Sequence, residues 1–445
     1  METTLFGPES GRSLDWQLFQ ATRLGKLYQT IPFRALTQSL PAKKSNAGVK
    51  GRFTAAGGIG LQILKHYYKQ SDEKLIEQLN DNWVMQYFCG IRLPRAERIK
   101  DAEVVGRWRS YLGKHLDIDL AQYVISKDWG EDMEQSQTNL SDATCIESYV
   151  RYPTDAKLLW ESVEYLWTEL RKLSRAIGLP LFRSKYKELK SAYLSYSKQR
   201  RKTYKQTRKL KRRLLYMLKK LLGLTPGIIA LWKKNQVLLK QYPVKRNFFE
   251  RLSTIKKVLG QQQLMFTQGI NKVKDRIISL AKPYLRPIVR GKENKRVEFG
   301  MKVNVMQVDG INLIEYGSFD AFNEGTRLKK TVWKHRKYFG ALLQLGADRI
   351  YATNKNRKFC KQQGIFTGFI PKGRKSNNKQ QKQLRSLINK ERATRLEGSF
   401  GTVKNHYLLD KVKARKEHTE RAWIFFGFLT ADIVVMSKKT KPPPK

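Results

Sequence analysis

The chain has 445 residues, which is enough for two or three domains of ordinary size. Lysine and arginine number 88 against 38 acidic residues, and the resulting net charge of +50 predicts a polyanionic partner. Because this charge is spread along the chain, nucleic acid is favoured over a membrane surface. Hydrophobic residues at 40% and aromatic residues at 11% exclude a disordered basic tail. The scattered cysteines and histidines exclude zinc fingers and redox motifs, and the N-terminal composition predicts an intracellular protein without a secretory leader.

The N-terminal part is expected to begin with a loosely ordered segment, 1–55, followed by an all-helical domain, 56–120. Apolar residues recur there at three- and four-residue steps from Ile59 to Tyr67, and Ser71 then provides a helix N-cap with Asp72 and Glu73 in the first turn. Two interpretations of this domain stay open. It is a structural or dimerising module, or it is a helix-turn-helix-like reader of DNA.

A first core strand is predicted within 121–154, because residues 141–150 alternate and are rich in β-branched types, with Asp142 close to the start. A helical block, 155–290, follows. Within it, segment 182–222 holds 16 basic residues, a single acid and several tyrosines. A helix with this charge repels itself unless a polyanion neutralises it, so we expect it to contact a nucleic-acid backbone. The basic residues selected for this contact are Arg200, Arg201, Lys205, Arg208 and Arg212.

The remaining core, 291–436, begins with a two-residue period, and Asp309-Gly310 between the alternating runs predicts a β-hairpin. A helix is expected at 320–338, a strand at 341–347 that ends at Asp348, a helix at 354–363 and a strand at 365–370. Segment 372–395 contains nine basic residues and one acid, and we expect a mobile loop that leads into a helix with Glu397. The basic, proline-rich tail, 437–445, is expected to be disordered.

With the helical block treated as an insertion after the first strand, the order of elements is that of an α/β ribonuclease-H-like domain. Such a domain converges its carboxylates at the first strand, the end of the fourth strand and the last core helix, where Asp142, Asp348 and Glu397 lie. Hydrolysis and transfer of phosphodiesters at two Mg²⁺ ions, or Mn²⁺, requires hard oxygen ligands of this kind. These three acids are therefore the predicted catalytic and metal-binding set. Three other acids are weaker candidates for this set: Asp309, Asp320 and Glu324. Asp309 is more simply the hairpin residue before Gly310, Asp320 is more simply the N-cap of the helix that follows, and Glu324 could help to orient the site.

Three local segments carry a resemblance to a known family. They are Ser-Asp-Ala-Thr at 141–144, Ala-Asp-Arg-Ile-Tyr-Ala-Thr-Asn-Lys-Asn-Arg at 347–357 and Arg-Leu-Glu-Gly-Ser-Phe-Gly-Thr-Val-Lys at 395–404. Together they resemble the catalytic segments of bacterial insertion-sequence DDE transposases, in the branch that pairs a glutamate with a lysine seven residues on. The stretch from Ser71 to Gly90 looks like the helical N-terminal domain of the InsH type that such transposases carry. Seven residues are two helical turns, so Glu397 and Lys404 are expected on one helix face.

The resemblance also implies contacts to DNA ends. The family often places an arginine four residues before the glutamate, where this chain has Ala393, with Arg392 and Arg395 on either side. A tyrosine that commonly precedes that arginine is replaced by Lys390. The residues expected to contact DNA phosphates near the active site are Lys404, Arg395, Arg392, Lys372 and Arg374.

The sequence thus predicts a DDE transposase of the bacterial cytoplasm, associated with the nucleoid. As the resemblance implies, it would bind the terminal inverted repeats of its element, cleave a strand at each end and join the 3′-OH to target DNA with two metal ions. The partners expected are double-stranded DNA and a second copy of the chain, without a membrane or a small-molecule substrate. Two alternatives stay open: an inactive or repurposed transposase-derived DNA-binding protein, and an RNA-associated basic protein.

Overall fold

The chain folds as two compact units, Met1–Tyr149 with Gly300–Lys445 as unit 1 and Val150–Phe299 as unit 2, and each is described by itself. The structure is a computed structural model, and it describes residues 14–38, 40–41, 51–94, 96–234, 246–289, 297–373 and 378–439. Arg374 and the segment 440–445 of the predicted tail lie outside the described residues. The domain boundaries given above remain predictions.

A mixed sheet forms the centre of unit 1. Its strands lie in the order β4, β3, β1, β5, β6, and β7 pairs with the end of β1. β3 is antiparallel to both β1 and β4, whereas β5 is parallel to β1 and β6 is parallel to β5. The predicted mixed α/β class is therefore confirmed. The bounds are β1 (Thr138–Ser148), β3 (Val297–Val308), β4 (Ile311–Ser318), β5 (Gln344–Ala347), β6 (Phe366–Thr367) and β7 (Lys411–Val412).

The predicted hairpin joins β3 and β4. Asp309 and Gly310 both have positive φ angles, 48° and 87°, and Val308 pairs with Ile311 across the turn. Two consecutive left-handed residues are what a two-residue hairpin turn requires, and an Asp-Gly pair supplies them at little cost. Asp309 thus has the turn role predicted for it.

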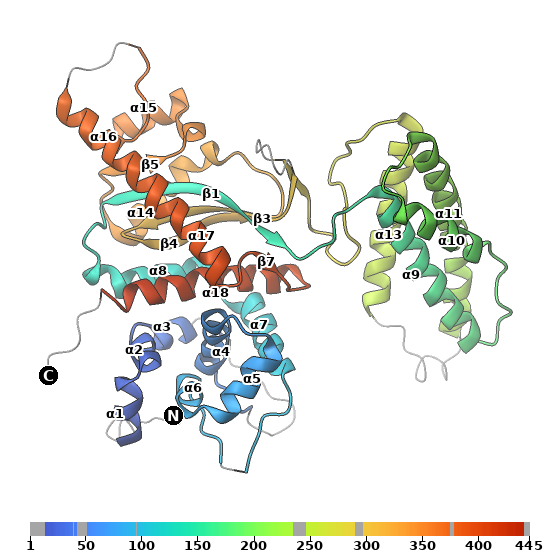
Figure 1. Ribbon diagram of the computed structural model, residues 1–445, viewed down its shortest axis with the longest axis horizontal. Helices are drawn as coiled ribbons and strands as arrows, with labels where there is room; N and C mark the ends of the chain where they lie inside the picture. Colours follow the sequence, from blue (N-terminus) through green and yellow to red (C-terminus); the bar gives the residue numbers. More distant parts are fainter. Residues whose placement is uncertain are drawn as a thin grey trace. The chain divides into compact units, whose positions relative to one another are not determined.

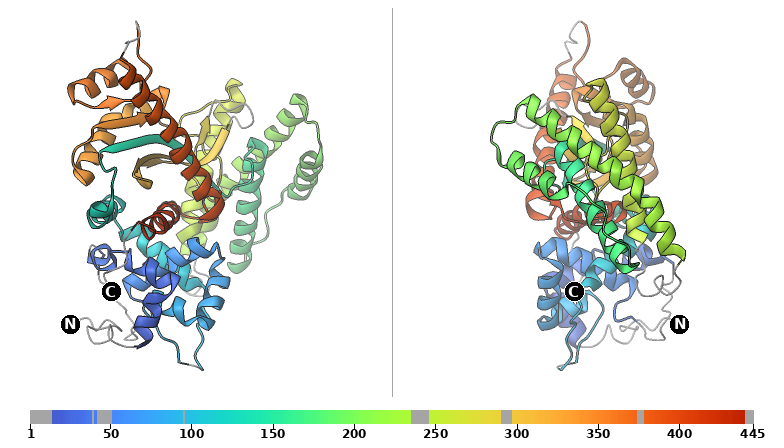
Figure 2. Two further views of the ribbon diagram at one scale, coloured as in Figure 1. Left: turned by 60° about the vertical axis from the view of Figure 1, so that its left-hand side comes forward. Right: turned by 90° about the vertical axis from the view of Figure 1, so that its right-hand side faces the viewer.

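Helices cover both faces of this sheet. On one face, Asn139 of β1 meets His335 of α14 (Leu328–Phe339) with 3.3 Å between Nδ2 and Nδ1. On the other face lie α16 (Lys379–Glu391), the π-helical turn η5 (Arg392–Leu396) and α17 (Glu397–His406), which continue into one another across β1 (Figures 1 and 2). Most of the segment predicted as a mobile loop, 372–395, is therefore helical, because Asn378 caps α16 with its side chain.

A glycine lets α16 approach the sheet. A Cβ atom at Gly346 in β5 would lie 2.8 Å from Leu140 and 2.9 Å from Ile388 of α16. These distances are below ordinary contact, so a larger residue would push the helix outward. The absence of a side chain at this position sets the spacing between β5 and the helix that leads to Glu397.

The N-terminal helices of unit 1 pack on its last helix. The segment expected to be loosely ordered, 1–55, instead contains three helices within its described part, because Phe19, Leu24 and Leu36 are buried there. Further along, α18 contacts both α4 and α7. The bounds are α1 (Leu14–Ala21), α2 (Arg23–Gln29), α3 (Phe33–Gln38), α4 (Ala55–Tyr68), α5 (Asp72–Asp81), α6 (Trp83–Phe88), α7 (Glu103–His115), α8 (Ile118–Trp129), η2 (Gly130–Asp132) and α18 (Glu417–Met436).

The other short elements of unit 1 lie between β4 and β6. The helix expected at 320–338 begins later, since Asn323 caps the 3₁₀ helix η3 (Glu324–Arg327) and α14 starts at Leu328. Asp320 is therefore not the cap. The 3₁₀ helix η4 (Arg349–Tyr351) and α15 (Asn354–Gln362) follow β5.

Unit 2 is mainly helical. The basic segment predicted as one helix, 182–222, forms two, α10 (Tyr186–Lys198) and α11 (Tyr204–Lys234), and α11 continues through Pro226. Buried leucines of α9 (Asp155–Ala176), such as Leu159 and Leu166, pack against α11, and α13 (Arg246–Gln268) contacts both. β2 (Pro287–Val289) pairs with the first residues of β3.

One helix of unit 2 is long and apolar enough to cross a membrane by length and composition, namely α11. Its apolar side is buried in the core of unit 2, where Leu214, Leu218 and Leu221 are fully buried. Its remaining face carries exposed lysines and arginines. This two-sided pattern is typical of a helix packed on a protein core.

Candidate active site

Two of the predicted acids lie on neighbouring strands of unit 1. Ser141 pairs with Ala347, so Asp142 in β1 and Asp348 after β5 are the next residues along two parallel strands. The side chain of Asp142 is 18% exposed, and its Oδ1 accepts a hydrogen bond of 2.7 Å from the Ala143 amide. Asp348 is exposed, and its Oδ1 accepts from the Arg349 amide at 2.6 Å. Strand pairing alone thus brings these two carboxylates to one edge of the sheet.

The third acid reaches the same place from a helix. Glu397 is the first residue of α17, and the Arg392 guanidinium lies between it and Asp142. Arg392 Nη1 is 3.1 Å from Asp142 Oδ2 and 3.2 Å from Glu397 Oε1. The side chains of Arg392 and Asp142 are only 17% and 18% exposed, so these two opposite charges attract strongly. The side chain of Glu397 is 54% exposed, so solvent screens its attraction to Arg392 more. One cation therefore holds the two carboxylates together.

A π-helical turn makes this contact possible. The amide of Glu397 donates to the carbonyl of Arg392, five residues earlier. In a regular α-helix, residues five apart point about 140° away from each other. The wider π turn brings them to nearly the same side. Arg392, five residues before the glutamate, therefore faces the site in a way that a regular helix would not allow.

Burial changes the acidity of one carboxyl group. Desolvation raises the pKa of Asp142 to about 6, and the nearby charges of Asp348 and Glu324 act in the same direction. The Arg392 guanidinium and the Ala143 amide oppose this rise by favouring the ionised form. Because desolvation dominates, Asp142 exchanges its proton much closer to neutral pH than an exposed aspartate does.

The carboxylates suit a hard cation, although they are not arranged around one. Within the described ranges, no three histidine, cysteine, aspartate or glutamate side chains are grouped so that they could hold a metal ion. Two observations explain this. Asp142 and Asp348 each direct an oxygen to a backbone amide, and a guanidinium separates Asp142 from Glu397. The position between Asp142 and Glu397 nevertheless already attracts a cation, and carboxylate oxygens are the ligands that Mg²⁺ prefers.

A buried polar network that the sequence did not reveal supports β1 from its neighbour β3. Asn304, which pairs with Ala143, accepts a hydrogen bond from Tyr351 at 2.5 Å and donates to Glu315 at 2.8 Å. Arg327 in turn donates to both oxygens of Glu315. These residues come from β3, β4, η3 and η4, and the folding of the two 3₁₀ helices against the hairpin brings their side chains together. The network keeps the backbone beside Asp142 in one position.

Glu324, one of the alternative acids, lies near the site but is paired. It forms an ion pair with Lys302, and the Lys302 ammonium also donates to the Phe322 carbonyl at 2.8 Å. Its charge is close enough to contribute to the raised pKa of Asp142. The sequence suggested an orienting role for Glu324 but gave no indication of Lys302.

The lysine predicted to share a helix face with Glu397 points toward β1. Lys404 Nζ donates to Thr144 Oγ1 at 3.0 Å. Thr144 is two residues after Asp142, so the two side chains lie on the same face of the strand. The alternation of the sequence around Asp142 was the one feature that could have identified Thr144.

Two other predicted phosphate contacts lie at the borders of this region. Arg395 pairs with Glu391 at 2.6 Å, and both line a pocket between α16 and the sheet together with Leu140 and Thr138 of β1. Lys372 is exposed and donates to Asn354 at the start of α15, at 2.8 Å. Arg395 thus lies beside the first residues of β1, whereas Lys372 lies beside the start of α15.

The basic residues selected in unit 2 differ in how freely they face solvent. Arg200 and Arg201 are exposed in the segment between α10 and α11, and Lys205 and Arg212 are exposed on α11. Arg208 is half-buried, with its guanidinium over the Phe266 ring at 4.8 Å and a hydrogen bond to Tyr204. Four of the five therefore present their charges to solvent.

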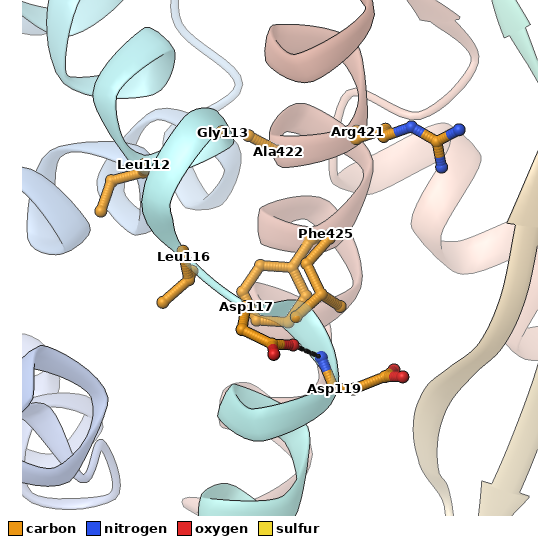
Figure 3. A pocket seen from close by; sticks show the side chains of 9 residues that line it. Leu112, Gly113, Leu116, Asp117, Asp119, Arg421, Ala422 and Phe425 are labelled. Atoms are coloured by element: carbon orange, nitrogen blue, oxygen red, sulfur yellow. Dashed lines mark hydrogen bonds between the residues drawn. The ribbon is translucent and has the colours of Figure 1, made fainter. Parts of the chain in front are cut away.

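A separate hollow in unit 1 has no features of a reaction site. It lies between α7, the start of α8 and α18, and its floor is apolar, with Leu112, Leu116 and Phe425 (Figure 3). Its polar groups already have protein partners: Asp117 caps α8, and Arg421 donates to Glu417 and to the Gly317 carbonyl. We interpret it as a packing defect between helices.

Two known protein families match this chain, one in its N-terminal part and one in its C-terminal part. Residues 345–434 match the family described as transposase DDE domain, and residues 12–111 match the family described as transposase domain (DUF772). The first range includes Asp348 and Glu397, whereas Asp142 lies in neither. A protein of Rhizobium meliloti described as "Uncharacterized protein ORF8 in nfe locus" is 27% identical over 117 residues, which are 26% of this chain. The chain spans 56% of the length of that curated relative. No solved structure matches.

Proposed function

We propose that this chain is an insertion-sequence DDE transposase that catalyses the movement of its own element, and its matches to two transposase domain families support this. It binds the terminal inverted repeats, cleaves a phosphodiester bond at each end and joins the liberated 3′-OH to target DNA. The observation that carries this proposal is the meeting of Asp142 and Glu397 at one guanidinium, with Asp348 on the adjacent strand.

A ribonuclease-H-like core is part of the proposal. The sheet order, with β3 antiparallel and β5 parallel to β1, supports it, as does the position of the acids on β1, after β5 and on α17. The helical unit 2, whose residues follow β1 in the chain, is proposed as the basic insertion of that core. Its exposed lysines and arginines fit the role of holding DNA through the phosphate backbone.

DDE transposases generally use divalent metals, and we propose that Asp142, Asp348 and Glu397 hold two Mg²⁺ or Mn²⁺ ions. When bound, such ions activate the attacking oxygen and stabilise the leaving oxygen of an in-line displacement. The protein supplies the remainder. Lys404 and Arg395 hold the phosphates of the DNA end, and the polar network around Asn304 keeps Asp142 in position. No side chain acts as the nucleophile, because water and then the DNA hydroxyl attack the phosphorus.

Two ends must be paired before an element moves, so a homodimer assembled on DNA is proposed. The site of action is the cytoplasm, on the DNA of the nucleoid.

The decisive experiment uses duplexes that carry the inverted repeats bracketing the gene, with Mg²⁺ or Mn²⁺ present. Asp348→Asn is expected to abolish end cleavage and to leave DNA binding nearly unchanged, because Asp348 is exposed and its amide replacement keeps the backbone contact. Asp410→Asn, at an exposed position after α17, serves as the control and keeps cleavage. Cleavage by the Asp348 variant would contradict the assignment of the acids.

The same assay separates the alternative functions. Specific binding of the ends without cleavage by the unaltered chain would favour a repurposed DNA-binding protein. Tighter binding of structured RNA than of terminal-repeat DNA would favour an RNA-associated protein.

A further inference from the structure

The contact of Arg392 with the two carboxylates has a geometry that suits a replaceable cation. A single nitrogen, Nη1, lies 3.1 Å from Asp142 Oδ2 and 3.2 Å from Glu397 Oε1. The carboxylates come from β1 and α17, and this nitrogen links them directly. We propose that Arg392 is an internal counter-ion, which occupies the space between Asp142 and Glu397 until a divalent ion binds and then passes to a phosphate of the DNA end. The inference rests on the proposed function.

Arg392 and a shared divalent ion exclude each other. Mg²⁺ binds carboxylate oxygens at about 2.1 Å, so an ion that contacts both of these oxygens needs the space in which Nη1 lies. Two positive charges this close also repel strongly in a partly buried site. Metal binding therefore requires the guanidinium to leave, and the free energy of the Arg392 contacts opposes metal binding.

The departing guanidinium needs another anion. The nearest helical neighbour of suitable charge, Glu391, is already paired with Arg395 at 2.6 Å. A DNA phosphate held beside the carboxylates offers two acceptor oxygens, which the planar guanidinium can bind with two parallel hydrogen bonds. The π turn at Arg392–Leu396 already directs this residue to the site, so the guanidinium can pass from a carboxylate to a phosphate by rotation about the bonds of its own long side chain.

Metal and DNA then favour each other's binding. DNA accepts Arg392 and so relieves the competition for the carboxylates, and metal frees Arg392 for DNA. By linkage the two effects are of equal size. In the absence of DNA, Arg392 offsets part of the negative charge of the carboxylates and metal binds weakly, which limits cleavage to the assembled DNA complex.

The first test measures Mn²⁺ binding to the full chain without DNA, by isothermal titration calorimetry and by the loss of the free Mn²⁺ electron paramagnetic resonance signal. Arg392→Gln is expected to bind Mn²⁺ about tenfold more tightly than the unaltered chain, because the competing cation is gone. Arg395→Gln is the matched control. It removes one charge from the same helical turn but touches neither carboxylate, and its Mn²⁺ affinity should change less than about twofold.

A charge-conserving variant separates displacement from net charge. Arg392→Lys keeps the positive charge, but its shorter side chain cannot reach both oxygens, so it should also bind Mn²⁺ more tightly than the unaltered chain. The proposal would be overturned if Arg392→Lys left the Mn²⁺ affinity unaltered while Arg392→Gln and Arg395→Gln raised it equally. Net charge alone would then explain the change in Mn²⁺ affinity.

The second test measures binding of a pre-cleaved DNA end, in EDTA and in Mn²⁺. Arg392→Gln should weaken this binding about tenfold in Mn²⁺ and hardly at all in EDTA, where the guanidinium stays with the carboxylates. Arg395→Gln should weaken it equally in both. An equal loss in both conditions for Arg392→Gln would contradict a metal-dependent transfer of the guanidinium.

The outcomes also distinguish this inference from the proposed function. If Mn²⁺ binds to the unaltered chain and Arg392→Gln binds it no more tightly, the role of Arg392 is wrong while the metal site stands. If neither the chain nor any variant binds Mn²⁺, with or without DNA, the metal site is wrong and both proposals fail.

Discussion

Lys404 and Thr144 are joined by a hydrogen bond of 3.0 Å between the ammonium on α17 and the hydroxyl on β1. Because Thr144 follows Asp142 by two residues, this bond directs a positive charge along the strand face that carries the acid. Lys404 is two helical turns after Glu397 on the same helix. The pair therefore fixes both the direction of α17 and the place where a phosphate finds a cation.

The first prediction concerns that cation. Lys404→Ala should weaken binding of a terminal-repeat duplex by about tenfold, the equivalent of one charge-assisted hydrogen bond. It should also reduce the slope of log affinity against log salt by about one. Fluorescence anisotropy at several salt concentrations measures both. Thr144→Val keeps the Lys404 charge and removes only the hydroxyl that positions it, so we expect a smaller loss of DNA affinity and an unchanged salt slope. A salt slope that falls as much as for Lys404→Ala would contradict these separate roles of Lys404 and Thr144.

A second prediction concerns the basic face of α11. Lys205 and Lys209 are exposed there, four residues apart on the same side of the helix. The double variant Lys205→Gln/Lys209→Gln should weaken binding of any duplex, regardless of sequence, and lower the salt slope by about two. The control, Lys256→Gln/Lys257→Gln, removes the same charge from exposed positions of α13. Equal losses for both double variants would show that net charge alone, rather than a face of α11, holds the DNA.

The third prediction concerns pH and a buried histidine of α4. Burial lowers the pKa of His66 to about 3, and the neighbouring charges of Lys65 and Arg109 add to the effect. Its Nδ1 is 2.8 Å from the Gln62 carbonyl and must donate, which fixes the Nδ1–H tautomer of the ring that burial keeps neutral. The unfolded chain takes up a proton below about pH 6.5 and the folded chain only near 3, so stability is lost as the pH falls between these values.

At pH 5 this loss amounts to about 2 kcal/mol relative to pH 7. Urea unfolding of the unaltered chain and of His66→Gln at both pH values measures it, and the variant should lack this part of the pH dependence. His406→Gln removes a histidine from an exposed position and is the control. The same pH dependence in the chain and in the His66 variant would contradict a neutral, buried imidazole.

The fourth prediction compares a glycine whose Cβ position is crowded, Gly346, with one whose Cβ position is open, Gly401. Gly346→Val should destabilise unit 1 by about 1–3 kcal/mol, because its side chain meets Leu140 and Ile388 where the helix approaches the sheet. Gly401→Ala, in α17 with open space around its Cβ position, should stabilise by about 0.5–1 kcal/mol. Thermal unfolding of both variants provides the measurement. A neutral Gly346→Val would mean that α16 does not need this close approach.

The sequence alone supplied the family resemblance, the three acids and the hairpin at Asp309-Gly310. These are local properties: a hairpin depends on two backbone angles, and a catalytic segment is a short string of residues. The alternation around Asp142 placed it on a strand, and the seven-residue spacing placed Lys404 beyond Glu397 on one helix. Composition alone predicted a polyanionic partner, because the net charge of +50 does not depend on how the chain folds.

Only the tertiary structure decided what surrounds these residues. The segment expected to be loosely ordered, 1–55, forms helices because its apolar residues find partners in α4 and α6, and Pro226 is accommodated because α11 is fixed by α9. The sequence predicted Arg392 near the active site as a phosphate contact, but a regular helix would turn it away from Glu397, and only the π turn brings the two side chains to one side. Contacts such as Arg392 with Asp142, or Lys404 with Thr144, join residues 250 or more positions apart. No local pattern determines such pairs, because they depend on how a whole sheet and its covering helices pack.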